Sequence, residues 1–420
     1  MFTMNSLLLW LILMLVFMAA YALSAQRRAV ISRAAREQVN AAAPAVAPET
    51  LAALQSRLAP MLAVTGHKAF GDVVQFTGHL KGEPDEMFRK IREVFAGDPV
   101  TPMLLEGEDN DVRLVILPQQ QTEAEPKRVN WALHWLLFFA TLATTTWAGA
   151  LHAGVNLLRQ PERFAVGLPY SLALLLILGS HELGHYFTAK AHGIRVTPPY
   201  FIPVPFALGT FGAFIKINSL TPDRRALFDV AVAGPLTGLV FAIPALLIGL
   251  RFSEVIPGNG DSGLGQVGVD IGSSVLLAFL ANLSLGASVL EGNHLLLHPL
   301  AFAGWLGLIV TALNLLPIGQ LDGGHISHAL FGTRAARAIS MVAMVSLFLL
   351  ALFVWPGLMF WAFIVFFIAG MRDAPAANDL TPVGPPRMAL GYFTFLVLLL
   401  IIVPVPHSLY QAFSVHSPYL

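Results

Sequence analysis

The pentapeptide His181-Glu182-Leu183-Gly184-His185 ends an apolar run that starts near Leu172. Residues four apart on an α-helix share a face, so His181 and His185 can direct both imidazoles at one metal ion. Glu182 lies beside them and can take a proton from an attacking water molecule. A carboxylate at the centre of a membrane helix costs roughly 3 kcal/mol, whereas each leucine returns about 0.5 kcal/mol. The pattern predicts a zinc site inside a membrane helix, and the plainer alternative is a pair of hydrogen-bonded bundle histidines with an incidental glutamate.

Composition supports the membrane setting. The chain has 420 residues, of which 56% are hydrophobic and 12% charged, and its net charge is zero. Such a composition is typical of a polytopic membrane protein and gives no indication of nucleic-acid binding. Because the chain contains no cysteine, a zinc site must use histidine and carboxylate ligands, and no disulfide supports an outer domain.

The distribution of positive charge predicts the topology. Apolar segments lie near 6–23, 131–150, 170–190, 228–250, 299–316, 338–354, 357–371 and 389–405. If these eight segments alternate across the bilayer, most arginines and lysines between them fall on one side. We therefore expect eight spans, an outside N-terminus and a cytoplasmic segment at 24–130. A cleaved signal peptide stays open as an alternative, because Ala20-Tyr21-Ala22 resembles a cleavage site.

Four regions follow from this reading. Residues 1–25 are an N-terminal transmembrane anchor, 26–130 a cytoplasmic linker and small α/β regulatory domain, 131–405 a membrane-embedded core and 406–420 a tail. Within the small domain, strands are expected at 73–78, 103–105 and 112–117, and a helix from Pro84 to about Phe95. Residues 271–290 are predicted to form a re-entrant or interfacial helix, because a ninth span would break the charge alternation.

Two histidines leave a zinc ion short of a third protein ligand. Asp322 is the only carboxylate in the segment 314–325, and its apolar neighbours make it costly without a partner. His181 lies roughly 17 Å along its helix from Tyr170, whereas an unbroken helix from Gly304 would carry Asp322 about 27 Å. Unwinding near Pro317–Gly319 can return Asp322 to the metal.

Other roles remain open in this segment. Asp322 can instead cap a short helix at 323–330. Asn314 either orients substrate or makes a hydrogen bond within the bundle. His325 can complete the site, but an interfacial position is the preferred interpretation.

A third segment, residues 198–217, is apolar and interrupted by proline and glycine. Thr210–Ile217 has the composition of a strand, and it follows the motif helix directly. An exposed strand edge there can pair with an unwound substrate. Gly209, Thr210, Phe211 and Gly212 are therefore candidate substrate-binding residues, and a packing loop is the alternative.

These motifs together resemble the site-2 protease family of intramembrane zinc metalloproteases. The matching parts are HELGH at 181–185, the segment 209–214, Ala233-Gly234-Pro235, and Asn314-x-x-Pro317 with Leu321-Asp322-Gly323-Gly324. The chain looks most like the branch of chloroplast gravitropism-deficient-and-yellow-green proteases and their bacterial and archaeal relatives. That branch has a Gly-Asn-Leu-Arg element, from which Gly78-His79-Leu80-Lys81 departs at His79 and Lys81.

The resemblance implies one zinc ion per chain, held by His181, His185 and Asp322 in a six-helix core, with Glu182 as general base. It also implies cleavage of peptide bonds in or near transmembrane segments of membrane proteins, in the plasma membrane of a bacterium or archaeon. Two alternatives remain: a membrane metal or proton transporter, which would need charged groups along a path, and an inactive protease-like scaffold, against which the intact Glu182 argues.

Overall fold

A computed structural model describes residues 48–107, 111–118, 129–257, 268–269, 274–286, 293–353, 358–369 and 375–406. The chain divides into two compact units, Met1–Gln121 and Thr122–Leu420. The predicted first span at 6–23 and nearly all of the predicted tail at 406–420 lie outside the described residues.

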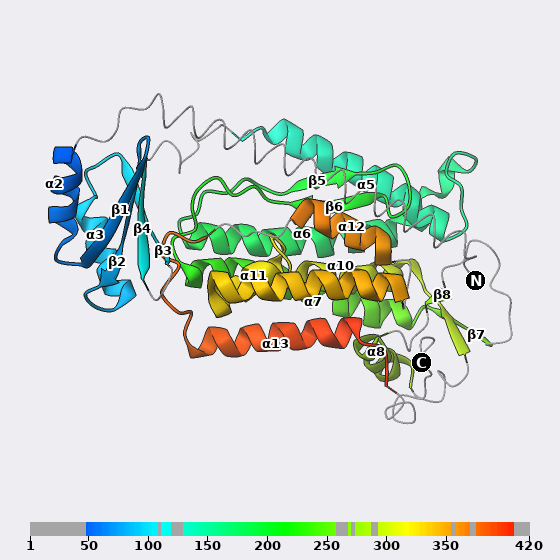
Figure 1. Ribbon diagram of the computed structural model, residues 1–420. Helices are drawn as coiled ribbons and strands as arrows, with labels where there is room; N and C mark the ends of the chain where they lie inside the picture. Colours follow the sequence, from blue (N-terminus) through cyan, green and yellow to red (C-terminus); the bar gives the residue numbers. More distant parts are fainter. Residues whose placement is uncertain are drawn as a thin grey trace. The chain divides into compact units, whose positions relative to one another are not determined.

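The first unit is a four-stranded antiparallel sheet with two helices (Figure 1). In chain order its elements are α2 (Pro48–Leu58), β1 (Leu62–Phe70), β2 (Val73–Leu80), α3 (Pro84–Val94), β3 (Val100–Glu106) and β4 (Val112–Pro118). The strand order is β1-β2-β4-β3. Phe76, Leu114 and Leu104 are paired across the strands and fully buried, so they form one apolar face of the sheet.

Most of these elements coincide with segments for which the sequence predicts a strand or a helix, but β1 does not. After Leu62, strand β1 is mostly exposed and contains Gly66 and Lys68. It therefore lacks the alternation of apolar and polar residues by which a half-buried strand is recognised. Its place in the sheet comes from antiparallel pairing with β2.

The second unit is a helical bundle. Its helices are α5 (Trp131–His152), α6 (Leu168–Ala191), α7 (Arg224–Leu250), α8 (Val275–Leu285), α10 (Pro299–Leu315), α11 (Asp322–Phe353), α12 (Leu358–Ala369) and α13 (Pro385–Ile402), with a 3-10 turn η1 (Pro161–Gly167) before α6. A hairpin of β5 (Tyr200–Pro203) and β6 (Thr210–Phe214) follows α6, and β7 (Glu254–Pro257), β8 (Gly268–Val269) and β9 (Asn293–Leu296) form a small antiparallel sheet. Helices α6, α10 and α11 all pack against α7 (Figure 1).

Glycine lets the central helices approach closely. A Cβ atom at Gly184 on α6 would overlap the Thr237 hydroxyl and the Ala233 carbonyl of α7. On the other side of α7, a Cβ at Gly304 of α10 would lie 2.5 Å from the backbone nitrogen of Leu246. Glycine at these two positions therefore lets α6 and α10 lie closer to α7 than a residue with a side chain would allow.

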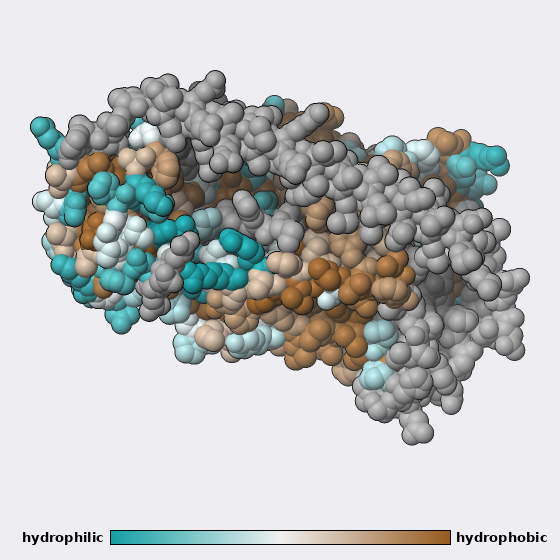
Figure 2. Space-filling model, viewed as in Figure 1, coloured by the Kyte–Doolittle hydropathy of each residue, from teal (hydrophilic) through white to brown (hydrophobic). Residues whose placement is uncertain are grey.

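Among the described residues, four helical segments are long and apolar enough to cross a membrane: Pro161–Ala191, Arg224–Leu250, Asp322–Phe353 and Pro385–Ile402. Helix α10 is apolar but shorter. Large apolar side chains stay exposed on α11 and α13, among them Val342, Val345, Leu396 and Leu399. Figure 2 shows hydrophobic residues gathered on this face of the unit. Such a surface suits lipid contact.

Two segments differ in extent from their predicted forms. Helix α11 starts at Asp322, well before the predicted sixth span at 338–354, and it bends at Gly332, where φ is 82° and ψ is 169°. Within 271–290, α8 has 11 residues, which corresponds to about 16 Å of helix, roughly half the thickness of a bilayer core.

Candidate metal centre

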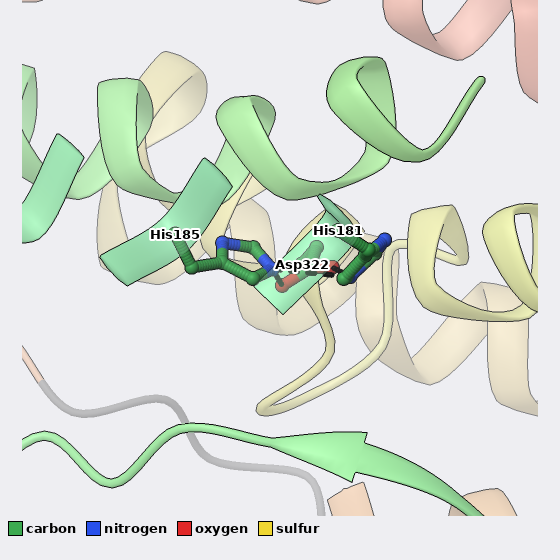
Figure 3. A group of neighbouring side chains, drawn as sticks. All are labelled: His181, His185 and Asp322. Carbon is green, nitrogen blue, oxygen red and sulfur yellow. Dashed lines mark hydrogen bonds and ion pairs between the residues drawn. The ribbon is translucent and has the colours of Figure 1, made fainter. Parts of the chain in front are cut away.

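The two histidines of the HELGH motif lie on the buried face of α6. His181 is 4% exposed and His185 is 7% exposed. Their Nε2 atoms are 3.1 Å apart, because residues four apart on a helix lie one above the other. Both imidazoles thus present one nitrogen to the same point (Figure 3).

Asp322 reaches this point from the far side of the bundle. Helix α10 ends at Leu315, and the chain turns before α11 starts at Asp322. Gly319 has a φ of 49° in this turn, a left-handed conformation that glycine adopts readily. A Cβ atom at Gly323 would overlap the Leu315 carbonyl, and one at Gly324 would overlap the Gly319 carbonyl. The turn therefore depends on glycine to bring Asp322 back to the histidines, as the unwinding argument predicted.

The geometry of the three side chains fits a zinc ion. Asp322 Oδ2 lies 3.3 Å from His181 Nε2, and Asp322 Oδ1 lies 3.4 Å from His185 Nε2. In a tetrahedral site with bonds of about 2.1 Å, neighbouring ligand atoms lie about 3.4 Å apart. The ligand atoms of His181, His185 and Asp322 can all be within bonding distance of one ion.

Helix α7 fixes the orientation of His185. The Nδ1 atom of His185 lies 2.7 Å from the Val230 carbonyl oxygen, which can only accept a hydrogen bond. The proton therefore belongs on Nδ1, and Nε2 keeps its lone pair for a metal. A Cβ atom at Gly234, one turn further along α7, would collide with the His185 ring. Sequence reasoning missed Val230, because only a backbone atom takes part.

Glu182 and Asn314 lie next to the three ligands. The Glu182 side chain is buried, and its carboxylate lies close to the backbone N–H of Ile215, just beyond β6. The Asn314 amide nitrogen lies 3.2 Å from His181 Nε2. Both candidates from the sequence are therefore adjacent to the point on which the ligands converge.

The residues Gly209–Gly212 lie at the start of β6. Strand β6 pairs with β5 on one edge only within the described residues. The Thr210 hydroxyl donates to the Ile202 carbonyl at 2.8 Å, and Phe211 is 61% exposed. Gly209 packs against α5, where a Cβ atom would lie 2.5 Å from Thr145 Cα. The four residues thus hold the hairpin to the bundle and leave its other edge open to a partner strand.

The chain is similar to known proteins. The family model for peptidase family M50 matches residues 169–353. Probable zinc metalloprotease EGY2, chloroplastic, from Arabidopsis thaliana is 31% identical over 358 residues, covering 82% of this chain and 62% of the relative. Probable zinc metalloprotease EGY1, chloroplastic, from the same plant is 28% identical over 378 residues, covering 81% of this chain and 68% of the relative.

A third relative is probable zinc metalloprotease EGY3, chloroplastic, from Oryza sativa subsp. japonica. It is 28% identical over 373 residues, covering 84% of this chain and 63% of the relative. The chain thus spans less than two thirds of the length of the EGY2 relatives. No solved structure matches the chain.

Proposed function

We propose that the protein is a zinc endopeptidase that cleaves peptide bonds in or near transmembrane segments of membrane proteins. The match of residues 169–353 to the model of peptidase family M50 supports the proposal. One observation carries the proposal. The convergence of His181, His185 and Asp322, with ligand-atom separations of 3.1 to 3.4 Å, matches a zinc site inside an apolar bundle. The three relatives are named as probable zinc metalloproteases, which agrees with this chemistry.

Each residue has a definite task in this reaction. His181, His185 and Asp322 would hold one zinc ion per chain, which when bound polarises the scissile carbonyl and lowers the pKa of the attacking water. Glu182 takes the proton of that water and later delivers it to the leaving amine. The Asn314 amide, 3.2 Å from His181 Nε2, is placed to donate a hydrogen bond to the substrate carbonyl.

Substrate would bind as an added strand on β6. Thr197 N–H donates to the Lys216 carbonyl, so Lys216 faces the β5 side of the hairpin. Successive residues of a strand point their N–H groups to opposite edges, so Ile215 and Ala213 face the free edge. The Ile215 N–H already lies at the Glu182 carboxylate. An unwound substrate paired there would run past the general base, with Gly209–Gly212 at the start of the paired stretch.

The surrounding chain is assigned as follows. We place eight spans in the membrane, with a short re-entrant β element at β5 and β6, the N-terminus outside and residues 26–130 as a small regulatory domain in the cytoplasm. Residues 1–25 form the anchor, 131–405 the protease core and 406–420 the tail. The membrane is the plasma membrane of a bacterium or archaeon, although the named relatives are chloroplastic.

The Glu182→Gln variant tests the proposal. Glutamine has nearly the same shape but cannot act as a base, so purified E182Q should retain one zinc per chain and lose cleavage of a model transmembrane peptide. His181→Ala should lose both zinc and cleavage. Metal analysis and peptide cleavage on the same samples decide the matter. An active E182Q enzyme, or a wild-type protein that binds no zinc, would overturn the assignment.

A further inference from the structure

The turn that joins β5 to β6 has an unusual backbone. The Gly209 N–H donates to the Phe206 carbonyl at 3.0 Å and closes a four-residue turn. Within it, Ala207 has a φ of 52° and Gly209 a φ of 81°. A non-glycine residue in the left-handed region is uncommon and persists where its surroundings hold it. The surroundings of this turn are side chains of α5 and α6.

Two consecutive carbonyl groups of the turn accept hydrogen bonds from these helices. The Tyr170 hydroxyl on α6 donates to the Leu208 carbonyl at 2.9 Å. The Thr144 hydroxyl on α5 donates to the Gly209 carbonyl at 2.7 Å. We call Thr144 and Tyr170 the tip clamp. Tyr170 is fully buried, so its hydroxyl has a fixed position.

The other end of β6 lies next to the proposed general base. The backbone N–H of Ile215 is close to the carboxylate of Glu182, which is on the same helix as Tyr170. Tyr170 and Glu182 are about 18 Å apart along α6, and Gly209 to Ile215 spans about 20 Å when extended. Strand β6 therefore runs along α6 (Figure 1), from the tip clamp at one end to Glu182 at the other. A rigid helix thus fixes how far the strand reaches toward the metal centre.

We infer that Thr144 and Tyr170 are positioning residues that set the register of β6 against Glu182 and so determine which peptide bond of a bound strand is cut. The inference rests on the proposed function. A substrate strand that pairs with β6 takes its register from β6. If the pairing shifts, the substrate keeps the same side chains on the same face only when it moves by two residues at a time. If the tip clamp is loosened, β6 can slide along α6, and a second bond then reaches the base.

The experiment compares Thr144→Val, Tyr170→Phe and the double variant with the matched control Thr146→Val. The Thr146 hydroxyl donates within α5, to the Leu142 carbonyl at 2.7 Å, and does not reach the hairpin. Each protein cleaves a model transmembrane peptide, and mass spectrometry identifies the bond that is cut. Zinc content and thermal stability are measured on the same samples. Thr→Val and Tyr→Phe preserve side-chain volume, so the single variants are expected to fold.

Wild type and Thr146→Val should cut one main bond. The double variant should cut that bond and also a second bond, two residues away. Its kcat at the original bond should fall about 10- to 100-fold, because a small misplacement of the reacting groups has an effect of this size. Its zinc content should be unchanged. If all clamp variants cut the wild-type bond with wild-type kcat and KM, the clamp is only structural. If the double variant is unfolded, the single variants decide in the same way. A wild-type protein without zinc or cleavage would instead overturn the proposed function.

Discussion

Asp322 occupies the first position of α11, and its two carboxylate oxygens face different histidines at 3.3 and 3.4 Å. A helix cap would direct its oxygen at backbone N–H groups of the first turn. Here the oxygens point to the ligand nitrogens instead. The sequence left both roles open, because the same residue type serves both. The glycine-dependent turn before α11 brings both oxygens next to the histidines, which favours the ligand role that we propose.

Asp322→Ala should weaken zinc binding strongly. Loss of a group that only supports a ligand costs roughly 10- to 100-fold in metal affinity, and loss of a ligand should cost at least as much. Zinc occupancy at limiting metal measures the effect. Asp98→Ala is the control, because Asp98 is exposed in the first unit and pairs with Arg57. Full occupancy in Asp322→Ala would mean that another residue is the third ligand.

Gly234 contributes by having no side chain. A Cβ atom there would overlap the His185 ring, so Gly234→Ala should displace the ring and lower zinc affinity. Gly179→Ala on α6 is the matched control, since its Cβ would meet Phe201 at an ordinary 3.6 Å. The control should bind zinc normally and be as stable as wild type or slightly more so, because alanine favours helix by about 1 kcal/mol. Normal zinc affinity in Gly234→Ala would show that α6 and α7 separate easily.

At the scale of elements, strand β6 is where the chain departs most from a simple bundle. Proline and glycine in 198–217 exclude a regular helix, so a strand could be predicted there from sequence. Its pairing with β5 and its contact with Glu182 through Ile215 could not, because both depend on the path of the intervening chain. Strand β1 was missed because it lacks an apolar face of its own. The short helix expected at 323–330 and the span expected at 338–354 are joined in α11, which bends between them at Gly332.

Ala213→Pro tests whether β6 binds substrate through its backbone. Proline has no N–H, and the alternation along the strand places the Ala213 N–H on the free edge, so the fold should lose no hydrogen bond to β5. We expect cleavage to fall much further in Ala213→Pro than in Ala213→Val, with zinc content normal in both. Peptide cleavage, zinc analysis and thermal unfolding of the same preparations give the result. Wild-type cleavage by a folded Ala213→Pro protein would identify the hairpin as a packing element.

For the whole molecule, the ligand triad is the part that sequence predicts best. The spacing of His181 and His185 follows from helical geometry, and an isolated Asp322 in an apolar segment needs a partner. The number of spans is harder to derive. In the part of the chain that the structure describes, four helical segments meet the length and hydropathy expected of a span, while α10 is shorter and α5 carries adjacent threonines. Charge between segments is therefore the main guide to topology, and it can be tested independently of the fold.

Single cysteines can map the topology without background, because the chain contains none. Ser56 is exposed on α2 in the first unit, and Gln160 is exposed between α5 and α6. With residues 26–130 in the cytoplasm and the loop after α5 outside, Ser56→Cys should be protected from an impermeant thiol reagent in intact cells, whereas Gln160→Cys should react. Permeabilised cells provide the control, since both positions should then react.

Both variants should also retain peptide cleavage, because neither residue takes part in the proposed chemistry. The expected orientation follows from charge. Short loops rich in arginine and lysine stay on the cytoplasmic side of the membrane, because moving each of these charges across the bilayer would oppose insertion. Labelling of Ser56→Cys together with protection of Gln160→Cys would mean that the orientation is inverted. Labelling of both would mean that the first span does not place the small domain inside. In either case the eight-span arrangement would have to be abandoned, while the zinc chemistry at His181, His185 and Asp322 would stand on its own geometry.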